Sequence, residues 1–116
     1  MATQFLQQVQ SIMQDYALKS QTVCDPTLSE TSCDLWITEI ERLVVTRIPQ
    51  PTETGWADDY MLVCYYYPHI DGPPTVVPVA DKPKCSAILL SSDVGEEALL
   101  EAVWHIIDMP RDTNVA

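Results

Sequence analysis

The segment 59–67, DYMLVCYYY, is the clearest strand in the sequence and the feature that most constrains the fold. Side chains alternate between the two faces of a strand. One face therefore carries Met61, Val63, Tyr65 and Tyr67, and the other carries Leu62, Cys64 and Tyr66. Because both faces are apolar, the strand is expected in the centre of a sheet that is covered on two sides, or covered on its second side by a partner.

Each end of the chain carries the spacing typical of an amphipathic helix. The first pattern predicts a helix over about 3–18, whose apolar face is Phe5, Leu6, Val9, Ile12, Met13, Tyr16 and Ala17. The second predicts a helix that begins at Ser92 or Asp93, where Asp93 and Glu96 form a variant of the capping box. This helix is expected to end at about Asp108, before Pro110.

Residues 31–48 carry two conflicting patterns. Apolar residues in the first part have helical spacing, whereas the last six, LVVTRI, are rich in β-branched residues. We expect a helix over about 31–42 that runs into a strand over about 42–48, and one long bent strand is the alternative. Residues 49–55, PQPTETG, are rich in chain breakers and predict a turn or an exposed loop.

The segment 68–83 contains five prolines. Two short extended pieces are expected at about 75–79 and 86–91, and the prolines restrict the first of them to a sheet edge. A long segment with little structure of its own is uncommon in a compact domain unless it is functional. We therefore expect residues 68–83 to form an extended binding arm or loop.

These elements together predict an α+β fold, with a small antiparallel or mixed sheet of three to five strands packed by an N-terminal and a C-terminal helix. A chain of 116 residues is expected to form a single compact domain over 1–116, with a frayed tail at 110–116. Some phage neck and tail subunits and some secretion chaperones share this order of elements, which is an analogy of architecture alone.

The chain is strongly acidic, with 17 Asp and Glu against 6 Lys and Arg and a net charge of −11. Such a surface repels nucleic-acid backbones and anionic membranes, so we expect direct contact with neither. The N-terminus lacks the basic and apolar regions of a classical signal peptide, and no apolar run reaches the ~20 residues of a membrane span. The expected location is the cytoplasm or the inside of a virus particle.

Residues that could support catalysis or hold a metal are scarce. The four cysteines, Cys24, Cys33, Cys64 and Cys85, contain no CxxC pair and match no common zinc site. The two histidines have no evident nucleophile beside them, and no phosphate-binding or nucleophile motif occurs. We expect no enzymatic activity, no cofactor and no bound metal.

The C-terminal helix has an apolar arc wider than one sheet face normally covers. Its polar positions form one narrow stripe that starts at Glu97 and recurs four, eight and eleven residues later. One interpretation wedges the helix between the sheet and the N-terminal helix. The other places Leu100, Trp104 and Ile107 against a second subunit or another partner, because aromatic anchors are typical of interfaces.

The run Tyr65-Tyr66-Tyr67 is the second candidate for a partner interface. Tyrosine combines a large apolar body with a hydrogen-bonding tip and is common at interfaces. No basic residues are interleaved with the tyrosines, so stacking on nucleic-acid bases is not expected. Packing in the core and at the strand end is the alternative interpretation.

These features favour a non-enzymatic protein-interaction or assembly subunit that acts in a homo-oligomer or a larger particle, for example as a phage structural component. The alternative is a small acidic inhibitor, such as an immunity or anti-defence protein, that binds a basic nucleic-acid-handling target as a nucleic-acid mimic. Self-association through apolar contacts should tolerate salt, whereas a complex with a basic target should weaken as ionic strength rises.

Overall fold

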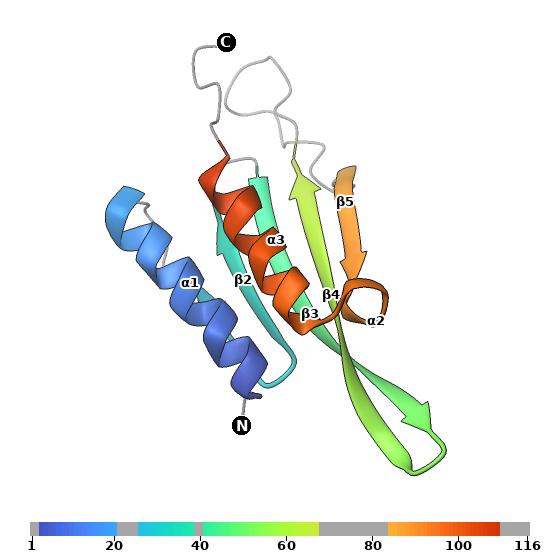
Figure 1. The fold of residues 1–116 in the computed structure, drawn as a ribbon. Helices are drawn as coiled ribbons and strands as arrows, with labels where there is room; N and C mark the ends of the chain where they lie inside the picture. Colours follow the sequence, from blue (N-terminus) through green and yellow to red (C-terminus); the bar gives the residue numbers. More distant parts are fainter. Residues whose placement is uncertain (1–2, 21–25, 39–40, 68–83, 110–116) are drawn as a thin grey trace, which may run out of the picture.

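The computed structural model describes residues 3–20, 26–38, 41–67 and 84–109 of the 116-residue chain. Five antiparallel strands form one sheet in the order β1-β2-β3-β4-β5, and the two long helices lie together on one face of it (Figure 1). The predicted α+β fold, with an N-terminal helix and helical structure at the C-terminal end, is confirmed. None of the helices in these ranges is long and apolar enough to cross a membrane.

The N-terminal helix α1 spans Gln4–Ser20 and ends two residues later than the sequence predicts. Thr3 caps it, because the Thr3 Oγ1 atom accepts a hydrogen bond from the Leu6 N–H at 3.3 Å. The predicted apolar face packs on the sheet and buries Leu6, Val9 and Met13 completely. The periodicity of 3–18 therefore identifies both the helix and the face that it buries.

The C-terminal helical region is divided in two, whereas the sequence predicts one helix. A short helix α2, Ser91–Val94, is followed by Gly95 and then by α3, Glu96–Asp108. Gly95 has a φ of +87°, a conformation that glycine adopts without steric cost. The predicted capping box of Asp93 and Glu96 is wrong, because Asp93 lies inside α2 and no side chain caps α3.

Residues 31–48 contain a hairpin. The strand predicted over about 42–48 is confirmed as part of the second strand of this hairpin, whereas the helix predicted over about 31–42 and the alternative of one long bent strand are wrong. Strand β2, Ser32–Trp36, pairs with β3, Glu41–Thr52, in a register that places Leu35 opposite Leu43. On its other side β2 pairs with the two-residue strand β1, Thr27–Leu28. Residues 33, 35 and 37 are all buried on one side, which is the period of a strand and not of a helix.

Strands β3 and β4, Gly55–Tyr66, pair along their whole length, from Glu41 opposite Tyr66 to Thr52 opposite Gly55. The expected loop at 49–55 is therefore mostly paired strand, closed by a two-residue turn. Residues 49–58 are all exposed, and this part of the hairpin, which we call the arm, projects beyond both long helices (Figure 1). The arm is the least expected element of the fold.

Strand β5, Lys84–Leu90, completes the sheet beside β4 and corresponds to the extended piece expected at 86–91. Three other expectations concern residues outside the described ranges. They are the extended piece at 75–79, the extended binding segment at 68–83 and the frayed tail at 110–116.

One hydrophobic core lies between the helices and the sheet. Helix α3 packs against both α1 and β4 and contributes Leu99, Val103 and Ile107. The sheet contributes Cys33, Leu35, Ile37, Leu43, Val45, Tyr60, Leu62 and Cys64. At the edge of this core the Tyr60 ring lies 4.3 Å from the Phe5 ring, and the Tyr60 hydroxyl donates to the Thr3 Oγ1 atom at 2.8 Å.

Asp59 joins the sheet to the C-terminal helices. One oxygen of its buried carboxylate accepts hydrogen bonds from the Ser91 hydroxyl and, at 2.8 Å, from the Ser92 N–H at the start of α2. The bond from Ser91 contributes most, and together these bonds lower the pKa of Asp59 below its ordinary value of 3.8 although burial opposes them.

Candidate interaction surfaces

The face of the sheet that points away from the helices is the first candidate surface, and we call it the open face. Within the described ranges no helix lies on it, because α1 and α3 share the other side (Figure 1). The strand register brings its residues from four strands into adjacent rows. The open face includes Ser32, Asp34, Trp36, Arg42, Val44, Thr46, Met61, Val63, Tyr65, Tyr67, Ile88 and Leu90.

The open face is apolar along its middle row. Val44 and Val63 are opposite each other and are only 9% and 2% exposed, although neither belongs to the core beneath the helices. Ile88 on β5 lies opposite Val63 and is 59% exposed. A solvated face of an antiparallel sheet normally carries polar residues. This row therefore resembles the inner side of a sheet more than its outer side.

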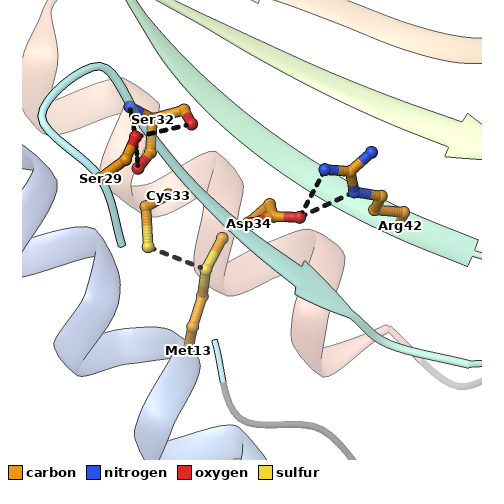
Figure 2. Close-up of polar contacts among 6 residues, drawn as sticks. All are labelled: Met13, Ser29, Ser32, Cys33, Asp34 and Arg42. Atoms are coloured by element: carbon orange, nitrogen blue, oxygen red, sulfur yellow. Dashed lines mark hydrogen bonds and ion pairs between the residues drawn. The ribbon is translucent and has the colours of Figure 1, made fainter. Parts of the chain in front are cut away.

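Figure 2 shows how β2 divides its side chains between the two faces. The Cys33 thiol points to α1 and lies 3.5 Å from the Met13 sulfur, whereas the next residue, Asp34, points to Arg42 on the open face. Burial, assisted by the charge of Asp34, raises the pKa of Cys33 to about 12. The Cys33 thiol therefore stays protonated and serves as a small apolar group of the core.

Four side chains form an aromatic corner at one end of the open face. The Trp36 and Tyr67 rings are 5.0 Å apart between centroids, and Tyr67 and Tyr65 are 6.5 Å apart. The Arg42 guanidinium lies 5.8 Å from the centre of the Trp36 ring, close enough for a cation–π contact. The corner thus offers large, amphipathic surfaces of the kind that anchor protein interfaces.

The charge of Arg42 is balanced within the open face. Its Nε atom donates to the Asp34 carboxylate at 2.7 Å, and a terminal nitrogen lies 2.6 Å from the same oxygen (Figure 2). Burial acts to lower the pKa of Arg42, but hydrogen bonds to Tyr67 and Asp34 outweigh burial and raise it. The Arg42 guanidinium therefore stays charged, and its ion pair with Asp34 leaves no net charge on the face.

The structure separates the three residues predicted on the C-terminal helix. Ile107 is 2% exposed and belongs to the chain's own core, so its side chain is not available to a partner. Leu100 is half-buried against the same core. Trp104 is 41% exposed, beside a shallow hollow lined by Glu101, Trp104, His105, Asp108 and Met109. Contact with α1 therefore accounts for part of the wide apolar arc.

The structure also separates the three tyrosines. Tyr65 and Tyr67 lie on the open face, whereas Tyr66 lies on the opposite side of β4 and is partly exposed. Trp36, which lies beside Tyr67, and Ile88, which lies beside Val63, were missed by sequence reasoning. Alternation within residues 32–36 could have placed Trp36 beside Asp34, but only the pairing of β4 with β5 brings Ile88 to this face.

Trp56 on the arm is the second candidate surface, and it was also missed. It is 76% exposed, and it lies directly opposite Pro51 near the tip of the hairpin. Two residues further from the tip on each strand, and on the same face, Asp58 lies opposite Pro49 and 3.5 Å from the Arg47 Nε atom. An apolar tip followed by a charged pair is thus presented at the end of a projecting element.

Few groups in the structure could support chemistry. In residues 3–20, 26–38, 41–67 and 84–109 no three His, Cys, Asp or Glu side chains are placed to hold a metal. Cys33 and Cys64 are buried and Cys85 is exposed, while Cys24 and His69 lie outside these ranges. Comparison of the chain with models of protein families, with curated proteins and with solved structures found no match.

Proposed function

We propose that this protein is a non-enzymatic assembly subunit that self-associates through the open face of its sheet. The observation that carries the proposal is the apolar row of Val44, Val63 and Ile88 on a sheet side that no described helix covers. Two sheets that pack through such faces bury them at a separation of about 10 Å. A second copy of the chain offers an identical apolar face.

The distribution of charge supports a second copy as the occupant. The open face carries one internally balanced ion pair, Asp34 and Arg42, while the rest of the surface is strongly acidic. Exposed acids elsewhere in the described chain are Asp15, Glu30, Glu53, Asp58, Asp93, Glu96, Glu97, Glu101 and Asp108. Two copies of a chain with a net charge of −11 repel each other least where the acids are absent.

The first test is the solution mass of the protein, measured by light scattering coupled to size exclusion at low and at high salt. The proposal predicts a discrete oligomer whose mass is unchanged or increased at high salt, because apolar contacts do not depend on unscreened charges. A monomer at both salt concentrations contradicts it. If the oligomer forms as predicted, particle assembly, for example within a phage virion, would build on it.

The exposed side of α3 is the other candidate contact surface for self-association. A substitution of Trp104 tests whether the contact lies there. Because Trp104 is 41% exposed, Trp104→Glu should leave the chain folded. We expect the variant to keep the mass of the wild type, since Glu101 and Asp108 beside Trp104 would repel the same residues of a second copy. A monomeric, folded Trp104→Glu protein would move the main contact from the sheet to α3.

An acidic inhibitor of a basic, nucleic-acid-handling target is the second candidate function. The exposed acids Glu97, Glu101 and Asp108 favour it, because they follow one side of α3 as phosphates follow a backbone. Such a protein would bind its target as a nucleic-acid mimic, and the complex would weaken as salt is raised. The expected location, in the cytoplasm or inside a virus particle, suits both functions.

A further inference from the structure

The arm has two different edges, and the hydrogen bonds at its base show which groups each edge presents. The Arg47 N–H points away from β4 and donates to the Thr31 carbonyl at 2.7 Å. The Tyr60 N–H, directly opposite in the register, points away from β3 and lies 2.9 Å from the Ser91 Oγ atom. Arg47 and Tyr60 are therefore a pair without hydrogen bonds between their own backbones.

The same orientation recurs at every second pair along the arm. Pro49 opposite Asp58 and Pro51 opposite Trp56 are thus also pairs whose amide positions point outward. On the β3 edge both positions are proline, which has no N–H to donate and blocks the approach of another strand. On the β4 edge the N–H groups of Trp56 and Asp58 point outward, where no described strand lies beside them.

One edge of the arm is therefore closed to strand pairing and the other is open to it. The open edge ends at Tyr60, because the outward N–H of Tyr60 already donates to the Ser91 hydroxyl. The open edge therefore spans residues 55–59. An isolated two-stranded ribbon is marginally stable in water, and a further strand would stabilise it. Trp56 next to this edge supplies an exposed anchor of the type that dominates binding energy in interfaces.

We infer that the β4 edge of the arm binds an extended, basic segment of another protein by strand addition, with Trp56 as its side-chain anchor. The inference is independent of the open face and of self-association.

The charges near the open edge select the partner. Glu53 lies in the turn, Asp58 on the edge strand, and Asp93 on α2, which contacts β4. Asp58 is paired with Arg47 on β3, so these three acids outnumber the nearby Arg47. Burial raises the pKa of Tyr60 at the base of the arm, and the negative charges of Asp58 and Glu96 raise it further, while the Arg47 charge opposes them. Two arms that paired edge to edge would bring these acids together, so a second copy of this chain is disfavoured.

Two synthetic probe peptides test the inference, acetyl-KVKVKVK-amide and its counterpart with glutamate in place of lysine. Backbone amide signals of the isotope-labelled protein are followed by NMR at low salt. The lysine peptide should shift the Trp56 and Asp58 amide signals and slow their hydrogen exchange. The glutamate peptide should bind at least about tenfold more weakly, as expected when the charge complementarity is reversed.

Two variants with matched controls separate the anchor from the edge. Trp56→Ala should weaken binding of the lysine peptide by at least about tenfold, whereas Trp104→Ala should not change it. Asp58→Pro removes the outward N–H together with the charge, while Asp58→Asn removes the charge alone. Asp58→Pro should therefore weaken binding more than Asp58→Asn, and far-UV circular dichroism checks that both variants fold.

Equal binding of the two peptides, or no change at the Trp56 and Asp58 amides, overturns the inference. So does a loss of oligomer mass in Trp56→Ala and Asp58→Pro with unchanged peptide binding, because a second copy would then occupy the arm. Failure of self-association in the wild type leaves these readouts intact, so the two proposals fail separately.

Discussion

The two faces of the sheet are made by the same strands but are covered in different ways. Leu62 and Val63 are neighbours on β4 and are equally buried, yet Leu62 lies under the helices and Val63 lies on the open face. Burial under the helices contributes to the folding of one chain. On the open face Val63 is covered by its own chain, but Ile88 beside it is 59% exposed, so the burial of Ile88 by a second chain should make stability depend on protein concentration.

The largest effect is expected on the covered face. Leu62→Ala removes a fully buried side chain from the core and should lower the free energy of unfolding by about 2–5 kcal/mol. Urea unfolding measures this loss, and it should be similar at low and high protein concentration. Ile88→Ala is the comparison variant on the open face, and its smaller loss should grow with protein concentration, because only a second chain would bury Ile88. Two losses that respond to concentration in the same way would remove the distinction between the faces.

The next effect concerns Asp59, which fixes the C-terminal helices to the sheet. Asp59→Asn should lower the free energy of unfolding by about 1–3 kcal/mol at neutral pH, because the bonds from Ser91 and Ser92 lose a charged acceptor. The pKa of Asp59 is lower in the folded chain than in the unfolded chain. The carboxylate therefore stabilises the folded protein at pH values above 3.8, the ordinary pKa of an aspartate side chain.

This stabilisation should disappear as the pH falls below that value and through the lower pKa of the folded state. Urea unfolding of the wild type and of Asp59→Asn between pH 7 and pH 2 measures the difference. The two stability curves should converge at acid pH. A constant difference across this range would show that Asp59 acts through packing and not through its charge.

The smallest effect on stability is expected for the ion pair of the open face. Asp34→Asn should cost only about 0.2–1 kcal/mol, because Arg42 is partly exposed. It should weaken self-association more visibly, since each copy would then bring an unbalanced guanidinium to the contact. The measured dissociation constant should rise at low salt and recover at high salt. An unchanged dissociation constant would place the contact away from Arg42.

Much of the fold could be predicted from periodicity, and the failures have definite physical causes. Strand β4 alternates without interruption, and α1 has one continuous apolar face, so local pattern was sufficient for both. In β2 the apolar residues satisfied helical spacing as well as alternation, and only pairing with β3 decides between them. Pro49 and Pro51 indicated a loop, but their positions require no N–H within the hairpin.

The candidate surfaces were less predictable because they depend on residues that are distant in the sequence. Tyr65 and Tyr67 were identified, but Trp36 beside Tyr67 and Ile88 beside Val63 come from other strands. Ile107 was assigned to an interface because the contact of α3 with α1 cannot be read from the helix alone. Trp56 was overlooked since it borders a segment whose prolines favoured a loop.

The most direct test of self-association through the open face compares Ile88→Asp with Val94→Asp. Both side chains are exposed, at 59% and 42%, but Ile88 lies on the open face and Val94 lies on α2. Light scattering coupled to size exclusion at high salt gives the mass of each variant and of the wild type. We expect Ile88→Asp to be a folded monomer and Val94→Asp to retain the oligomer of the wild type. An Ile88→Asp protein with the mass of the wild-type oligomer would contradict self-association through this face.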